Sequence, residues 1–267
     1  MGQRHQLFVI AKIKARYRTL AVVHHQWLLG YTAVRQCRNV LRILHAESNR
    51  HRLRQDLQKA QSYDFDSLSP PKNTRGVFPF ITTSLVLGAS LDAESGHHSS
   101  VHVLNIATRY DQVDNNDGIS IFDITELGKE RYAFCFLEDV EDPLNFLDSE
   151  DDLSIPERDE GRSQPEKHQI IDAETYLAVY CARGQGNVED FLYLAAACDA
   201  FPLVRAEALE SLWPGAGWTN MVHEDGELDG SSGSNHLSTL QEESLSKVID
   251  KALSCAPDDL SWVTQAE

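Results

Sequence analysis

The side chains best suited to chemistry in this sequence lie near the N-terminus, around its first two apolar segments. They combine imidazole, guanidinium, amide and indole groups, and the residues are Arg4, His5, His24, His25, Gln26 and Trp27. Imidazoles exchange protons near neutral pH, a guanidinium binds anions, and an indole covers an apolar ligand. If these side chains converge, they form a candidate binding or proton-transfer site.

Two apolar segments decide whether the side chains converge. Residues 6–13 and 19–26 are rich in Val, Ile, Leu and Phe, and a polar stretch separates them, so the pattern predicts a β-hairpin. A turn at Ala15 and Arg16 places His5 on the same face as His24 and Gln26. A register shifted by one residue gives His5 the neighbours His25 and Trp27 instead. The alternative to a functional site is a buried polar network that fixes the hairpin against the next helix.

Other patterns typical of catalysis are absent from the sequence. There is no P-loop, no Gly-x-Gly-x-x-Gly, no His-Glu-x-x-His and no Gly-x-Ser-x-Gly. The cluster of His97, His98 and His102 lacks a carboxylate or cysteine at ligand spacing, and residues 114–118 lack the first and last ligands of a calcium loop. We therefore interpret residues 114–118 as a hairpin turn and expect no catalytic residue, metal or cofactor.

The five cysteines are scattered and form no Cys-x-x-Cys pair, which favours reduced thiols.

Charge is divided unevenly along the chain. The net charge is -17, but residues 1–59 carry +10 and the remaining 208 residues carry -27. Arg50, Arg52 and Arg54 form a candidate basic surface or nuclear import signal. The division indicates a surface for macromolecular partners, an acidic interaction segment, or simple complementarity within the fold. Aromatic residues and DNA-reading motifs are scarce near the basic residues, so sequence-specific DNA recognition is not expected.

The remaining patterns predict an α+β protein, with the N-terminal hairpin in a mixed or antiparallel sheet flanked by helices and with acidic flexible loops. Helices are expected over residues 32–47, 49–61, 172–181, 188–200, 203–212 and 240–253, and strands over 101–107, 119–124 and 132–137, while 77–91 is ambiguous. We divide the chain into a core over 1–137, an acidic flexible linker over 138–166 and a helical part over 167–267. The helical part is expected to pack on the core and to contain a disordered loop over 223–238.

The opening MGQRHQLFVIAKI, with VHHQWLLG at residues 23–30 and DNNDG at residues 114–118, resembles a large family of uncharacterised proteins from filamentous fungi. The likeness covers residues 1–60 closely and 101–180 loosely. No activity or catalytic residue is assigned in that family, so the resemblance implies no site residue. It implies a fungal, intracellular setting and marks the end of the hairpin as the family's signature.

Two functions remain as expectations. The first is a non-enzymatic regulatory or interaction protein, cytoplasmic or nuclear, that engages macromolecular partners through its basic N-terminal surface. A protein is the expected partner, with non-specific nucleic-acid contact as a further expectation and no membrane contact, because no apolar run is long enough to span a bilayer. The second is a hydrolase or small-molecule-binding enzyme that uses His5, His24, His25 and Trp27.

Overall fold

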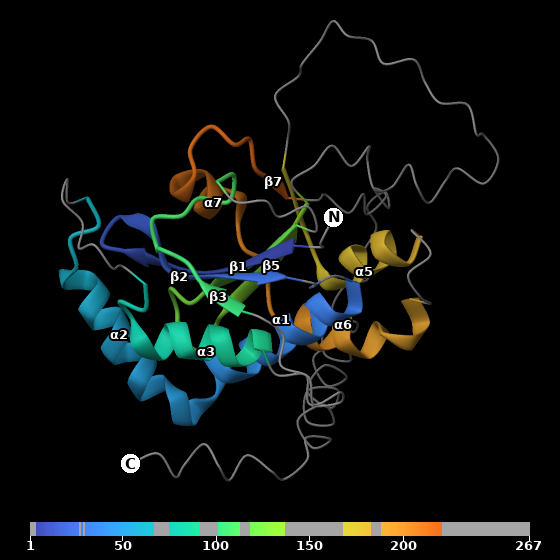
Figure 1. Ribbon diagram of the computed structural model, residues 1–267, viewed down its shortest axis with the longest axis horizontal. Helices are drawn as coiled ribbons and strands as arrows, with labels where there is room; N and C mark the ends of the chain where they lie inside the picture. The colour runs from blue at the N-terminus through green and yellow to red at the C-terminus, as the bar shows by residue number, and fades with distance from the viewer. Residues whose placement is uncertain are drawn as a thin grey trace, which may run out of the picture. The chain divides into compact units, whose positions relative to one another are not determined.

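The computed structural model of the protein describes residues 4–26, 28, 30–66, 75–90, 101–112, 118–136, 168–182 and 188–220. These residues belong to one compact unit, Met1–Met221, and a second unit comprises Val222–Glu267. The first unit contains one mixed sheet with helices on both faces, as Figure 1 shows. The prediction of an α+β fold with a mixed sheet is therefore confirmed.

The sheet has seven strands in the order β3-β2-β1-β4-β5-β6-β7. They are β1 (Arg4–Ile13), β2 (Arg16–Gln26), β3 (Val101–Val103), β4 (Ile119–Asp123), β5 (Arg131–Cys135), β6 (Gln169–Ile171) and β7 (Thr219–Asn220). β1 pairs antiparallel with β2 and parallel with β4, so the hairpin turn and the β4–β5 turn lie at the same end of the sheet. β6 and β7 have only three and two residues, too few to be predicted from periodicity. They extend the sheet, so residues 168–220 complete the fold of the core.

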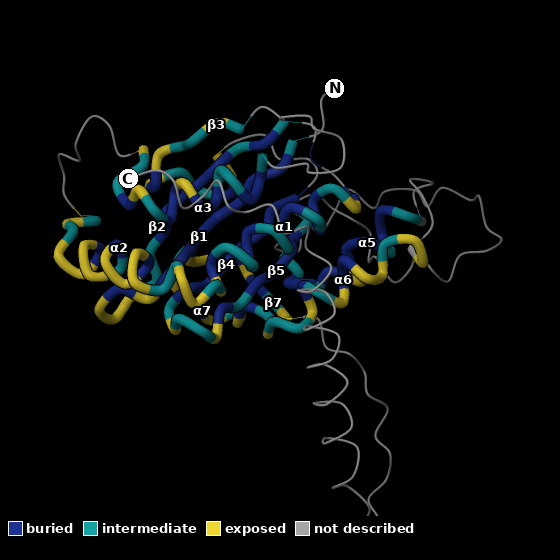
Figure 2. The backbone as a smooth tube through the Cα atoms, turned by 90° about the horizontal axis from the view of Figure 1, so that it is seen from below, coloured by how far each residue is buried: buried dark blue, intermediate teal, exposed yellow. Residues whose placement is uncertain are grey.

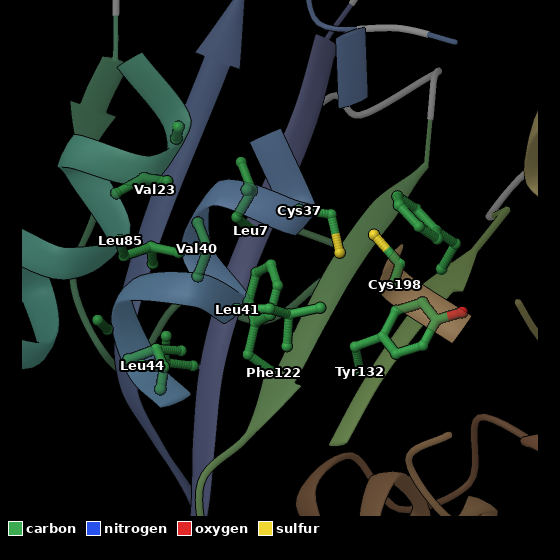
Figure 3. Close-up of a cluster of buried hydrophobic side chains, with 14 of the residues drawn as sticks. Leu7, Val23, Cys37, Val40, Leu41, Leu44, Leu85, Phe122, Tyr132 and Cys198 are labelled. Carbon is green, nitrogen blue, oxygen red and sulfur yellow. The ribbon is translucent and has the colours of Figure 1, made fainter. Parts of the chain in front are cut away.

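Alternation along the central strands divides their side chains between two apolar cores. The helices on one face are α1 (Gly30–His45), α2 (Arg50–Ser62), α3 (Pro79–Ser90), α5 (Ala173–Ala182) and α6 (Leu192–Asp199). The other face is covered by α7 (Ala206–Leu212) with Trp213 and Trp218. Leu7 faces the first core, part of which Figure 3 shows, and Phe8 faces the second. A strand covered on both faces explains why β1 lacks the usual alternation of apolar and polar residues. Figure 2 shows this burial of the central strands beside the exposed outer surface of α2.

Helix α3 resolves the ambiguity of residues 77–91. Pro79 is its first residue, where the missing N–H leaves no hydrogen bond unmade. The Asp56 carboxylate accepts hydrogen bonds from the backbone N–H groups of Phe80 and Ile81, at 2.8 and 3.0 Å. A side chain from α2 therefore caps α3, a contact that no local pattern in 77–91 indicates.

Two local predictions are wrong. The predicted strands over 101–107 and 119–124 do not form a hairpin, because β3 pairs with β2 while β4 pairs with β1 and β5, and residues 114–117 lie outside the described residues. Helix α7 begins at Ala206 and not at Leu203, because Leu203 forms a β-bridge with Tyr132. This contact with β5 keeps residues 203–205 in an extended conformation, so the helix begins three residues later than predicted. The predicted linker over 138–166, the loop over 223–238 and the helix over 240–253 lie outside the described residues.

Candidate functional site

The open end of the hairpin brings together only some of the residues expected there. His5 is directly opposite His25, and Gln6 is opposite His24, so the register differs by one residue from the one that a turn at Ala15 and Arg16 implies. The turn is at Lys14 and Ala15, and a β-bulge between Val9 and Ile10 shifts the pairing. His5 therefore shares a face with His25 and not with His24. Arg4 is opposite Gln26, and Trp27 lies outside the described residues.

His5 is completely buried between the sheet and α5. Its Nε2 lies 2.8 Å from the hydroxyl oxygen of Ser120 on β4. Its ring makes edge contacts with Phe134 on β5 and Tyr176 on α5, at centroid distances of 6.4 and 6.2 Å. Because aromatic rings close the imidazole off from solvent, this geometry is that of a structural hydrogen bond in a packed interior.

His25 lies beside His5 and is equally inaccessible, with 1% of its surface exposed. Its Nε2 is 3.5 Å from the side-chain nitrogen of Gln36 on α1. Burial lowers the pKa of the His25 imidazole to about 4, so this side chain is neutral at physiological pH. His5 with Ser120 and His25 with Gln36 thus form two buried polar pairs, which tie the hairpin to β4 and to α1.

Replacement of His5 by Leu should lower the free energy of unfolding by about 2 kcal/mol, because the Ser120 hydroxyl is left buried without its imidazole partner. The double variant His5→Leu with Ser120→Ala removes both polar groups and should recover most of that loss. Urea unfolding of the two variants and of Ser120→Ala alone measures the difference. Equal loss in the single and double variants would show that the hydrogen bond is not what holds His5 in place.

The opposite, closed end of the hairpin forms one wall of a groove that was not predicted from the sequence. The groove has a volume of about 730 Å³, opens to solvent, and is lined by residues 13–16, Arg18 and residues 62–66. The first segment is the hairpin turn and the last follows α2, so two segments nearly fifty residues apart form its walls. Three basic side chains belong to it, those of Lys14, Arg16 and Arg18.

Contacts across the groove fix its walls. The Lys14 backbone N–H donates to the Gln61 side-chain oxygen at 3.2 Å. The Arg18 guanidinium pairs with Asp66 at 2.7 Å and lies 5.4 Å from the ring centroid of Phe65. Lys14 and Arg16 are exposed and have no ion pair among the described residues. Asp64 and Asp66 also line the groove, and Arg18, Arg16 and Lys14 together lower the pKa of Asp66, so the lining carries three cations against two carboxylates.

The candidate basic residues of α2 do not share one surface. Arg50 pairs with Glu47, and Arg52 lies over the Phe80 ring with its guanidinium carbon 5.7 Å from the centroid. Arg54 is exposed and lies two helical turns before Gln61, on the side of α2 that meets the hairpin turn. None of the three arginines lines the groove.

Further basic residues lie at the same end of the sheet, although they belong to the acidic part of the sequence. Lys129 is in the β4–β5 turn, Arg131 begins β5, and Arg205 precedes α7. The parallel pairing of β1 with β4 places them near the hairpin turn, and the Lys12 backbone N–H donates to the Thr125 hydroxyl at 2.8 Å. No local sequence pattern predicts that Lys129, Arg131 and Arg205 lie here, because their position depends on the order of the strands in the sheet.

The described residues are close to electrically neutral. They contain 17 Lys and Arg against 15 Asp and Glu, so the acidic excess of the chain belongs to residues outside them. Residues 4–66 alone hold 12 basic against four acidic side chains. The basic surface is therefore a property of the folded sheet and its first two helices.

None of the described helices has an apolar stretch long enough to cross a membrane. In the same residues, no three His, Cys, Asp or Glu side chains are grouped so as to hold a metal ion. Comparison with known proteins finds no family model, no curated protein and no solved structure that matches the chain.

Proposed function

We propose that the protein is a non-enzymatic interaction protein that binds an acidic segment of another protein in the groove between the hairpin turn and α2. The observation that carries the proposal is the convergence of Lys14, Arg16 and Arg18 in one concave surface. Cations complement acidic side chains across an interface. The second expected function, catalysis by the histidines, is less favoured because His5 and His25 are buried.

An acidic protein segment fits the groove better than a nucleic acid does. Single-stranded nucleic acids stack their bases on free aromatic faces. Here the Phe65 ring is covered by Arg18 and stacks on Phe78 at 6.1 Å, while Tyr63 packs edge-on against both phenylalanines. A long polyanion also needs many cations along its path, whereas a short acidic segment needs only the few that the groove offers.

The test is fluorescence anisotropy with the full chain and a short labelled peptide rich in Glu and Leu. The double variant Lys14→Glu with Arg16→Glu should weaken peptide binding at least about tenfold, because two attractive charges become repulsive. Binding should also weaken as salt is added.

The matched control changes the same charge on the other side of α2. Arg52→Glu with Lys59→Glu alters two exposed basic residues that do not line the groove, and it should leave peptide affinity within about twofold of the wild type. Equal weakening by both double variants would show that only net charge matters. Tighter binding of a single-stranded oligonucleotide than of the peptide at physiological salt would also overturn the proposal.

For a protein of this kind we propose a cytoplasmic or nuclear location. A fluorescent fusion of the full chain tests it, and nuclear residence that is lost when Arg50, Arg52 and Arg54 are replaced by Gln would identify them as an import signal.

A further inference from the structure

A second concave site lies at the same end of the sheet, on the face that α7 covers. It is a small pocket, open to solvent, and it is lined by Tyr17, Asp123, Thr125, Glu126, Lys129, Arg131 and Arg205. Side chains alternate along β2, so Tyr17 faces this pocket while its neighbours Arg16 and Arg18 face the groove. A lining made mainly of polar and charged side chains suits a small polar group.

The Asp123 carboxylate at this pocket is already engaged by the protein. One of its oxygens accepts hydrogen bonds from the Thr125 backbone N–H at 2.9 Å and from the Thr125 hydroxyl at 2.5 Å. Arg131 is its direct partner across the β4–β5 ladder. Only 4% of the Asp123 surface is exposed, so this carboxylate does not act as a free negative charge in the pocket.

The cationic side chains of the pocket keep donors for a ligand. One guanidinium nitrogen of Arg131 donates to the Leu203 carbonyl at 3.2 Å, which fixes the group and leaves its other N–H donors. Arg205 is exposed and has no ion pair among the described residues. Lys129 pairs with Glu126 at 3.3 Å, but more than two thirds of each side chain is exposed, so this pair exchanges readily with solvent.

We propose that this pocket binds a phosphate group, held by the guanidinium groups of Arg131 and Arg205 and by the ammonium group of Lys129. Planar guanidinium groups bind phosphate oxygens in pairs, and a lysine adds a point charge to them. The Thr125 hydroxyl is occupied by Asp123 and by the Lys12 backbone N–H, so the cationic side chains are the donors that the pocket offers. The lining holds three cations against the two carboxylates of Asp123 and Glu126, so positive charge is in excess and suits an anion. The several oxygens of a phosphate can accept from more than one of these cations. This site lies on a different face from the groove, and its ligand is separate from the acidic segment proposed above.

Two sources supply such a group, free inorganic phosphate and a phosphorylated side chain. The test is a titration of the isotope-labelled full chain, followed by amide NMR, with inorganic phosphate and with a phosphoserine peptide at constant ionic strength. The amide signals of Thr125, Lys129 and Arg205 should shift with either probe. A peptide that binds more tightly than inorganic phosphate, while its unphosphorylated form does not bind, would identify the side-chain source, and equal affinities would identify the free ion.

Arg205, Lys129 and Glu126 are exposed, so we expect their replacement to test phosphate binding without unfolding the protein. Arg205→Gln and Lys129→Gln should each weaken phosphate binding about tenfold, since each removes a charged donor. Glu126→Gln should instead strengthen it, because the change frees Lys129 and removes a nearby negative charge. In the double variant Lys14→Glu with Arg16→Glu, which tests the groove, the amide signals of Thr125, Lys129 and Arg205 should still shift when phosphate is added. Unchanged affinity in Arg205→Gln and Lys129→Gln, or the same shifts with chloride, would overturn the proposal.

Discussion

Replacement of Gly88 by Ala should destabilise the protein by about 3 kcal/mol, the upper part of the range for added atoms in a packed interior. Gly88 lies in α3 where this helix crosses α1. A Cβ atom at this position would lie 2.8 Å from both the Cα and the backbone nitrogen of Val40, and closer still to a Val40 methyl group. Backbone atoms cannot turn aside, so the two helices must separate.

A loss of stability in Gly88→Ala, rather than a gain, would identify the contact with Val40 as its cause. In a helix without this contact, Gly→Ala stabilises by about 0.5–1 kcal/mol, because alanine loses less backbone entropy on folding. Val40→Ala in the Gly88→Ala background should recover only part of the loss, since the backbone contacts remain. Thr83→Ala, on the exposed side of α3, is the control and should change stability by less than about 0.5 kcal/mol. A stabilised Gly88→Ala variant in urea unfolding would contradict the close packing of α1 and α3.

The second large effect concerns pH. The pKa of His25 is about 4 in the folded protein and about 6.5 in an unfolded chain. Between these values the unfolded state binds a proton that the folded state does not bind, so stability falls as the pH falls. The full shift corresponds to about 3 kcal/mol, lost between pH 6.5 and pH 4.

Asp199 acts in the opposite direction over part of this range. Desolvation of its carboxyl group raises its pKa to about 6. The Tyr132 hydroxyl donates a hydrogen bond to it. Below pH 6 the folded state takes up this proton before the unfolded state does, so this group adds stability as the pH falls. The wild-type curve between pH 6 and pH 4 is therefore flatter than His25 alone would make it.

Comparison of variants separates the two groups. His25→Asn removes the imidazole, so the stability difference between wild type and variant should shrink by about 3 kcal/mol from pH 7 to pH 4. Urea unfolding at both pH values measures it. His51→Asn, on the exposed side of α2, is the matched surface control and should follow the wild-type curve. Parallel curves for wild type and His25→Asn would show that the His25 imidazole is not excluded from water.

At the candidate histidine site, a shift of one residue in the strand register changes which histidines share a face, and the local sequence does not determine that register. The polar residues at the open end of the hairpin were visible in the sequence, and so was the choice between a site and a buried network. The bulge between Val9 and Ile10 decided the register and brought His5 opposite His25. Burial was decided by Phe134 and Tyr176, which are far from the hairpin in sequence and close its polar end from solvent.

The basic end of the sheet shows a different limit. The positive charge of the N-terminal part could be counted from the sequence, but the basic residues that lie near it in the folded protein could not be predicted. Lys129, Arg131 and Arg205 belong to a strongly acidic stretch of sequence, and a charge count by segment hides them. The parallel pairing of β1 with β4 brings them to the hairpin turn. Parallel neighbours are joined by long connections, so local patterning does not indicate their order.

The sequence by itself determined the hairpin, the two helices that follow it, the α+β class and the concentration of positive charge near the N-terminus. These features depend on periodicity and composition, which act over a few neighbouring residues. Only the tertiary structure decided which histidines meet, which arginines stay free, and that a groove and a pocket lie on opposite faces of the hairpin's closed end. Those outcomes depend on strand order, a bulge and helix packing, in which the interacting residues are distant along the chain.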